Sequence, residues 1–248
     1  MISAGLGAVR LRYVASTAST NADLLNNIAA ANFPQEGEWL IADRQTAGRG
    51  RQGRAWSDGA GNFMGSTAIR LLPTDPAPAT LSLAAGLALF ETVAPLVPPV
   101  AGARLKWPND LLIGAAKVAG ILLEGAGGWI VMGFGVNLAS APVLSGRATT
   151  SLSSFGPAPD RDLFAANLAQ HLHQEVDRWR RYGLDPMLRR WTAAAHPIGT
   201  VLQVHPPGEP KVTGAFAGLN DDGSLRLRTG DGDVRTVTAG EVMLGSRG

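Results

Sequence analysis

The change of pattern after residue 195 is the feature that most constrains what this chain can fold into. Before it, amphipathic helical segments alternate with apolar segments of strand character. After it, short β-prone segments alternate with turns rich in Gly, Pro, Asn and Asp. A length of 248 residues accommodates one medium domain and one small one. We therefore expect an α/β domain at residues 1–195 and a small antiparallel β-barrel at residues 196–248.

Hydrophobic periodicity locates most elements of the first domain. Four helices are predicted, over Asn21–Ala31, Ala79–Ala94, Asp160–Tyr182 and Asp185–Ala195. Ser19 or Thr20 is the expected cap of the first helix. Strands are predicted at 39–43, 62–71, 104–107, 118–124 and 129–136, with a turn at Pro108–Asp110. The polar, glycine-rich residues 45–61 are expected to form a loop.

Composition excludes several classes of function. The chain has no cysteine, so it forms no disulfide, thiolate zinc site, iron–sulfur cluster or cysteine nucleophile. Its four histidines lack the HExxH spacing, and neither GxSxG nor GxxxxGK[ST] occurs. A net charge of +2 does not by itself argue for nucleic acid. No apolar stretch of about 20 residues and no signal peptide are recognised, which favours a cytoplasmic protein without a membrane partner.

Residues 45–56, QTAGRGRQGRAW, form an unusual arginine–glycine loop after a predicted strand. Its glycines let the backbone approach a ligand closely, and Arg49, Arg51 and Arg54 supply donors suited to phosphate and carboxylate. Trp56 at the end of the loop would anchor it or stack on a base. Composition alone leaves two alternatives open, a solvated linker and a nucleic-acid-binding segment.

Lysine is rare, since three of the 22 basic residues are Lys and the rest are Arg. Lys106 opens the segment KWPND, and Lys117 precedes an apolar strand. Asn109 and Asp110 follow the first lysine, and Asn137 ends a further strand. Ammonium, amide and carboxylate groups gathered at strand ends fit an anionic ligand with bound magnesium. Taken alone, the Pro-Asn-Asp segment is more simply an ordinary turn.

Four motifs in order resemble the biotin protein ligase family: GRGRQGRAW (48–56), KWPNDLL (106–112), KVAGILLE (117–124) and GFGVN (133–137). The resemblance implies an α/β mixed-sheet catalytic domain of the class II aminoacyl-tRNA synthetase and biotin–lipoate ligase type, with a C-terminal SH3-like barrel. It implies that ATP activates biotin to biotinyl-5′-AMP and that a lysine of a carrier domain then takes the biotin. Magnesium is expected on the ATP phosphates.

The resemblance also assigns site residues. Those implied to bind biotin are Ser19, Thr20, Asn21, Gln45, Gly48, Arg49, Lys117 and Gly120. Those implied to bind ATP or the adenylate are Arg51, Arg54, Trp56, Asn109, Lys117 and Asn137. The catalytic set is Lys117, Arg51, Lys106 and Asp110. Asp110 would either orient a lysine or help to place magnesium, and the sequence does not choose between these roles.

Partners and alternatives follow from the same resemblance. The expected acceptor is the biotin carboxyl carrier domain of a separate carboxylase, because the chain has no Met-Lys-Met segment. The STN motif begins at residue 19, which implies the enzyme-only type without a DNA-binding domain. The family includes homodimers, so the oligomeric state is open. The alternatives are a lipoate or octanoate ligase of the same fold, a catalytically dead biotin sensor or scaffold, and a nucleic-acid-binding module that uses the arginine–glycine loop and the basic helix around Arg178–Arg181.

Overall fold

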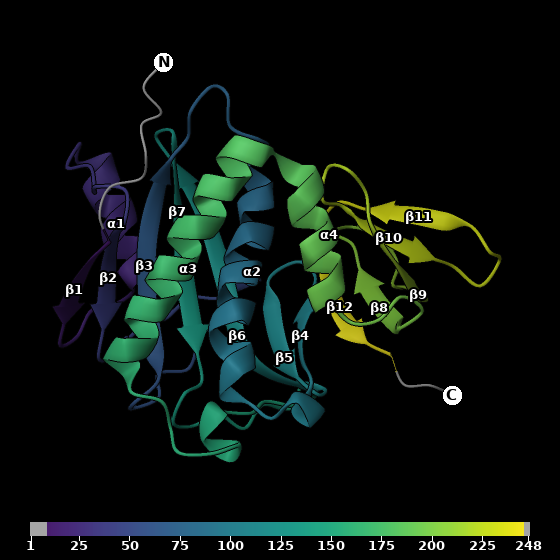
Figure 1. Ribbon diagram of the computed structural model, residues 1–248, viewed down its shortest axis with the longest axis horizontal. Helices are drawn as coiled ribbons and strands as arrows, with labels where there is room; N and C mark the ends of the chain where they lie inside the picture. Colours follow the sequence, from purple (N-terminus) through teal and green to yellow (C-terminus); the bar gives the residue numbers. More distant parts are fainter. Residues whose placement is uncertain (1–8, 246–248) are drawn as a thin grey trace.

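The computed structural model describes residues 9–245 and contains two β-sheets (Figure 1). The larger sheet has seven strands in the order β1-β2-β3-β7-β6-β5-β4. The β1–β2 pair is parallel and the remaining pairs are antiparallel. The strands are β1 (Arg10–Val14), β2 (Glu38–Ala42), β3 (Phe63–Arg70), β4 (Ala103–Lys106), β5 (Asp110–Ile113), β6 (Ala116–Ala126) and β7 (Trp129–Val136).

Alternation along the strands gives this sheet two apolar faces. Trp39 and Ile41 of β2 belong to the main core, whereas Leu40 between them packs in a smaller cluster. The helix α1 (Thr20–Ala29) covers the smaller cluster with Leu24 and Ile28. The helices α2 (Leu81–Val93) and α3 (Arg161–Tyr182) cover the main core on the opposite face (Figure 1). The helix α4 (Leu184–Ala194) follows α3 and packs against α2.

Polar side chains cap two of the helices, and the cap of α1 is one of the two residues predicted for it. Ser19 caps α1, since its Oγ accepts a hydrogen bond from the backbone N–H of Ala22. Asp160 caps α3 by accepting from the N–H groups of Asp162 and Leu163 at 3.0 and 2.8 Å. All four predicted helices form within two residues of their expected ends.

One apolar helical stretch is longer than the sequence analysis recognised. Residues 78–96 of the described chain are long and apolar enough to cross a membrane by length and composition. However, 61% of that stretch is buried inside the protein. It contains α2, which packs against α3 and against β4–β6 of the large sheet (Figure 1). We conclude that this stretch is the central core helix of the domain.

Two strands were not predicted. β1 (RLRYV) was not predicted because it is only five residues long and three of the five are exposed. β5 was read as part of a turn, but Asp110 is its first residue and pairs with both Lys106 and Gly120. The turn therefore comprises residues 107–109, one residue earlier than the predicted Pro108–Asp110, and the acidic side chain belongs to the sheet.

The C-terminal sheet has five antiparallel strands in the order β11-β10-β9-β8-β12, consistent with an SH3-like fold. Its strands are β8 (Val201–His205), β9 (Val212–Leu219), β10 (Leu225–Arg228), β11 (Val234–Val237) and β12 (Glu241–Leu244). Its inner residues, such as Leu202 and Phe216, join the same apolar core as α2 and α4. We keep the proposed domain boundary at 195/196, in the segment between α4 and β8.

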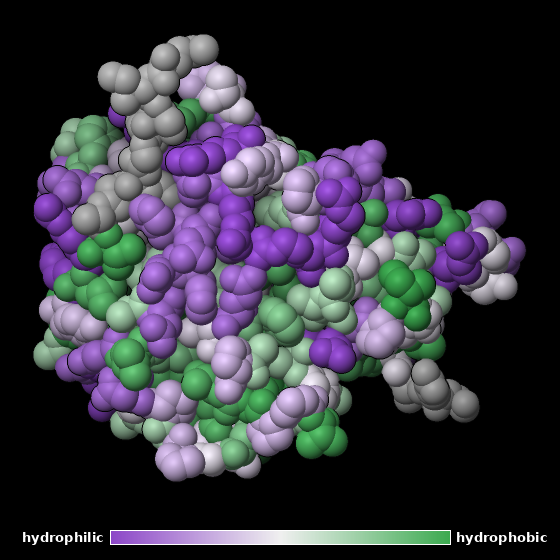
Figure 2. Space-filling model, viewed as in Figure 1, coloured by the Kyte–Doolittle hydropathy of each residue, from purple (hydrophilic) through white to green (hydrophobic). Residues whose placement is uncertain are grey.

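Nearby carboxylates neutralise the positive charge of the basic residues Arg178–Arg181 on α3. Hydrophilic side chains gather over α3 on the face shown in Figure 2. Arg178 pairs with Glu175, and Arg181 pairs with Asp177 at 2.9 Å. Arg180 pairs with Glu36 at 2.8 Å and with Asp75 at 3.3 Å. These ion pairs favour a solvated structural surface over a phosphate-binding one.

Candidate active site

Small side chains make a hollow on the α1 side of the large sheet. Ser66 of β3 pairs with Gly133 of β7, and Gly120 of β6 pairs with Gly135 of β7. Alternation places Gly133 and Gly135 on the same face as Val131, which α1 covers. Beyond the N-terminus of α1 these glycines leave a cavity of about 440 Å³. The arginine–glycine loop, β4–β7 and residues 240–242 of the C-terminal domain complete its walls.

A buried polar network forms the end of the cavity next to α1. The backbone N–H of Thr20 donates to Gln45 Oε1 at 2.8 Å. The Thr20 hydroxyl lies 2.6 Å from Ser66 Oγ, which donates to Asn21 Oδ1 at 2.6 Å. Asn21 Nδ2 in turn donates to Glu124 Oε2 at 2.8 Å. This end therefore offers uncharged hydroxyl and amide groups in fixed positions along the cavity lining, with the Glu124 carboxylate at the outer end of the network.

Asp110 holds two lysines at the other end. Lys117 Nζ lies 2.6 Å from Asp110 Oδ1, and Lys106 Nζ lies 2.8 Å from Oδ2. Burial would raise the pKa of Asp110, but the two ammonium groups outweigh it and lower the pKa to about 2. Burial lowers the pKa of Lys117, and the Asp110 carboxylate opposes that shift. The cluster is a fixed, ionised triad in a partly desolvated wall.

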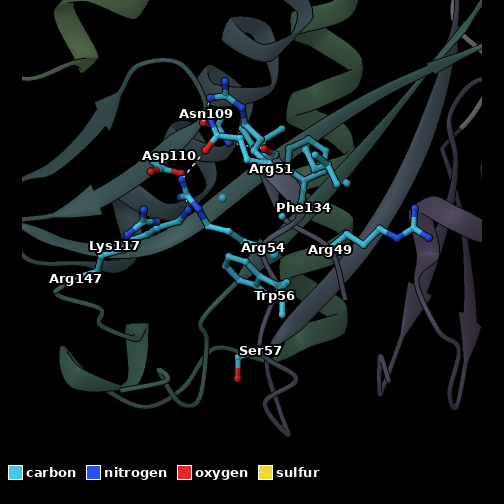
Figure 3. A pocket seen from close by; sticks show the side chains of 18 of the residues that line it. Arg49, Arg51, Arg54, Trp56, Ser57, Asn109, Asp110, Lys117, Phe134 and Arg147 are labelled. Carbon is cyan, nitrogen blue, oxygen red and sulfur yellow. Dashed lines mark hydrogen bonds and ion pairs between the residues drawn. The ribbon is translucent and has the colours of Figure 1, made fainter. Parts of the chain in front are cut away.

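Further cations surround this triad (Figure 3). Arg51 Nη1 donates to Asn109 Oδ1 at 2.9 Å, and burial lowers the pKa of Arg51. Arg54 and Arg147 both pair with Glu241 of the C-terminal domain. The cavity lining carries six cationic side chains and only two carboxylates, Asp110 and Glu241. Such an excess of positive charge suits a polyanionic ligand.

The arginine–glycine loop folds as a closed hairpin. Arg49 and Ala55 form an isolated bridge, and the Gly50 N–H donates to the Arg54 carbonyl at 2.7 Å. Gln52 and Gly53 make the turn with φ of 58° and 72°, a left-handed conformation that suits a tight hairpin. In Figure 3 Arg49 lies on the side of the cavity opposite Lys117 and Arg147. The loop therefore links the polar end to the cationic end.

The Trp56 ring packs on the sheet over Gly135, between the polar and the cationic end of the cavity. A Cβ added to Gly135 would lie 2.2 Å from Trp56 Cε2, so only glycine leaves room for this ring. Lys117 Nζ lies 5.7 Å from the ring centroid, within cation–π distance. The buried Trp56 Nε1 has no hydrogen-bond partner. The ring thus presents an apolar surface beside the cations, while its N–H is buried without a partner.

The C-terminal domain contributes directly to this site. Lys106 Nζ donates to the Val242 carbonyl at 2.7 Å, and Trp107 Nε1 donates to the Gly223 carbonyl at 3.1 Å. Both donors belong to the KWPND segment. The small domain therefore braces the strand end that carries the first lysine, a contact that sequence reasoning did not foresee.

The structure brings the predicted site residues together with one exception. All of them except Gly48 line the single cavity. A Cβ at Gly48 would lie 2.8 Å from the Trp56 carbonyl oxygen and 3.2 Å from Gln45 Nε2, so Gly48 supports the wall from behind. Asn137 is 3% exposed and donates to the Thr150 carbonyl at 3.0 Å.

Sequence reasoning missed several residues at the site, namely Ser66, Gly133, Gly135, Arg147 and Glu241. Gly133 and Gly135 belong to the motif GFGVN, and their spacing of two residues, which places both on one face of a strand, was the available signal. The other three come from segments that only the fold brings close.

The donor set does not fit a resident metal ion. Both oxygens of Asp110 accept from lysines, and Glu241 is paired with two arginines. Among residues 9–245, no group of three or more His, Asp or Glu side chains could hold a metal. Of the two roles open for Asp110, the geometry favours orienting lysines. Magnesium would enter as part of the nucleotide substrate, held by its phosphates.

Comparison with known proteins decides the family. Residues 13–137 match the model of the biotin/lipoate A/B protein ligase family, and residues 204–245 match the biotin protein ligase C-terminal domain. The chain belongs to the biotin protein ligase family. It is 41% identical to the biotin–[acetyl-CoA-carboxylase] ligase of Mycobacterium tuberculosis, over 98% of this chain and 92% of that protein.

Further similarities extend to other curated proteins and to solved structures. The bifunctional ligase/repressor BirA of Escherichia coli is 33% identical, over 92% of this chain and 72% of that protein. The fold is similar to that of the biotin protein ligase from Aquifex aeolicus in complex with biotin and ATP. That similarity has a TM-score of 0.81 at 23% identity and covers 95% of this chain and 99% of that one. The sequence-based predictions of family and fold class are therefore confirmed.

Proposed function

We propose that this biotin ligase family member activates biotin with ATP to biotinyl-5′-AMP and then transfers biotin to a lysine of a biotin carboxyl carrier domain. One observation supports this above the others. A single cavity joins an uncharged hydrogen-bonding end to an end where the Lys117–Asp110–Lys106 triad lies among arginines. The curated relatives named biotin–[acetyl-CoA-carboxylase] ligase support the same reaction.

The geometry suits the first step because a carboxylate and a triphosphate repel each other. The polar end would hold the ring of biotin and direct its carboxylate toward Lys117. Lys117 would then neutralise charge between that carboxylate and the α-phosphate while Arg51 and Arg54 hold the phosphates. The Trp56 ring, on the floor between the ends, would contact the adenylate. A closed loop would also keep water from the mixed anhydride.

In the second step the acceptor lysine attacks the carbonyl carbon of the mixed anhydride. An amide bond forms and AMP leaves, so the transfer needs access to the cavity from outside. We propose that the acceptor is a separate carrier domain and that the reaction takes place in the cytoplasm. The ion pairs that neutralise Arg178, Arg180 and Arg181 support a function without DNA.

Biotin-dependent exchange of labelled pyrophosphate into ATP tests the proposal, with lipoate and octanoate as matched substrates. Exchange with biotin alone is expected. Exchange with lipoate or octanoate in place of biotin would favour a lipoate-type ligase, and exchange with none of the three would overturn the proposal. Transfer to a biotin carboxyl carrier domain, followed by mass spectrometry, tests the second step.

A further inference from the structure

The carboxylate of Glu124 lies at the outer end of the polar network. Glu124 is the last residue of the motif KVAGILLE and is not among the predicted site residues. It follows Gly120 and Leu122 on the same face of β6, and its side chain is 27% exposed. Two groups of the biotin end contact it. Asn21 Nδ2 donates to Oε2 at 2.8 Å, and Arg49 Nη1 lies 3.9 Å from Oε1.

The carboxylate fixes which way the Asn21 amide faces. An ionised carboxylate can only accept hydrogen bonds, so the amide nitrogen must face Glu124. The amide oxygen then faces Ser66, whose hydroxyl donates to it at 2.6 Å. Gly133 leaves room for the amide, because a Cβ there would lie 2.2 Å from Asn21 Oδ1.

The orientation of the Asn21 amide also fixes the direction of the hydrogen bond between Ser66 and Thr20. Ser66 has one hydroxyl hydrogen, and Asn21 takes it. The 2.6 Å contact between the Ser66 and Thr20 hydroxyls therefore needs the hydrogen of Thr20. Once that hydrogen is used, the Thr20 oxygen faces the cavity as an acceptor only. Its 3.1 Å approach to Gln45 Oε1 is then the weaker contact, and that oxygen is already bonded to the Thr20 backbone N–H.

Two residues beside Thr20, namely Gln45 and Ser19, can donate a hydrogen bond to a ligand instead of accepting one. Gln45 Oε1 accepts from the backbone, so Gln45 can offer its amide nitrogen to a ligand. Ser19 Oγ accepts from the Ala22 N–H, so its hydroxyl hydrogen is free to donate. The polar end therefore presents one acceptor beside two donors. A cyclic urea, with an N–H next to a carbonyl oxygen, matches that pattern.

We propose that Glu124 is the positioning residue for specificity, which sets the donor–acceptor polarity of the biotin end through Asn21, Ser66 and Thr20. We call this chain of hydrogen bonds, from Glu124 through Asn21 and Ser66 to Thr20, the relay. The relay favours binding of a cyclic urea over binding of rings that lack an N–H donor. This inference rests on the proposed function, because it assumes that the ring of biotin occupies this end. It assigns Glu124 no contact with the reacting atoms.

Glu124→Gln tests the relay, because a glutamine side chain accepts with its oxygen or donates with its nitrogen and no longer dictates the polarity. We expect the Kd for biotin, measured by calorimetry without ATP, to rise about tenfold, and the KM for ATP to stay within about twofold. Glu124→Asp, which keeps an acceptor, should recover part of the loss. Glu38→Gln is the matched control, since Glu38 is 30% exposed and also lies near one arginine.

A double-mutant cycle separates the relay from the Arg49 contact and from a loss of fold. In a Ser66→Ala background the relay is already cut, so Glu124→Gln should change the Kd for biotin by less than about twofold. An equal loss in both backgrounds would overturn the relay, and so would equal changes in biotin and ATP affinity. If the unsubstituted protein activates biotin and Glu124→Gln has no effect, only the relay fails. If the unsubstituted protein does not activate biotin, the proposed function fails with it.

Discussion

Lys117 reaches Asp110 because a β-bulge lies between β5 and β6. The pairing runs from Asp110 opposite Gly120 and Leu111 opposite Ala119 to Leu112 opposite Lys117, so β6 contains one residue more than β5 at this point. Val118 and Ala119 consequently both face the main core. Without the extra residue, Lys117 would share the core-facing side of Ala119. With it, Lys117 faces the cavity on the side of Gly120.

Asp110→Asn is expected to destabilise the protein by about 2 kcal/mol at neutral pH, since the pKa of Asp110 falls from 3.8 to about 2 on folding. A carboxyl whose pKa is lower in the folded state stabilises it above about pH 4, and the contribution disappears as the pH falls toward 2. Urea unfolding of both proteins at several pH values checks this. A stability difference that stays constant down to about pH 3 would contradict the role of the ion pairs.

Lys117→Arg is expected to be as inactive as Lys117→Gln in biotin-dependent pyrophosphate exchange, with kcat reduced by about 10²–10³-fold. Lys117 Nζ lies 2.9 Å from the position of a Cβ on Gly120 and 5.7 Å from the Trp56 ring centroid. A planar guanidinium does not fit that space without moving Trp56. Substantial activity of Lys117→Arg would show that positive charge alone is sufficient.

Gly135→Ala is expected to displace Trp56 and to raise the KM for ATP about tenfold or more. The new Cβ would lie 2.2 Å from Trp56 Cε2, whereas ordinary contacts begin near 3.4 Å. The change in Trp56 should also alter the tryptophan fluorescence. Gly125→Ala is the matched control on β6, because its Cβ would meet Ile130 at 3.5 Å. Equal kinetic effects of the two variants would contradict a specific role for the Trp56 position.

The sequence predicted the long elements with a strong local pattern, and it did so for a physical reason. α3 repeats apolar residues at three- and four-residue spacing and α2 is a continuous apolar run, so local pattern determines both helices. The bulge before Lys117 and the bracing of Lys106 by Val242 depend on pairing between distant segments. The same is true of the position of Ser66, a small polar residue inside the largely apolar strand β3. The motifs thus predicted side chains that line one cavity, while only the fold shows how these side chains are oriented.

Arg51→Gly is expected to retain part of the adenylation activity but to release biotinyl-5′-AMP. Arg51 ties the loop to Asn109 at 2.9 Å, and without that contact the closed hairpin loses its attachment beside the phosphates. Free biotinyl-5′-AMP per ATP consumed measures the leak. Retention equal to that of the unsubstituted protein would contradict a closing role for Arg51.

The leaking variant also tests what the scarcity of lysine does for this protein. Lys106 and Lys117 are held by Asp110 at 2.8 and 2.6 Å, whereas Lys211 is exposed. A released acyl-adenylate acylates neutral, accessible amines, so the two paired lysines should resist it. After incubation of Arg51→Gly with biotin and ATP, peptide mass spectrometry should find biotin on Lys211 and little on Lys106 or Lys117. The double variant with Lys211→Arg should then lose that label. Labelling of Lys117 to the same extent as Lys211 would show that the Asp110 ion pairs do not protect the two paired amines.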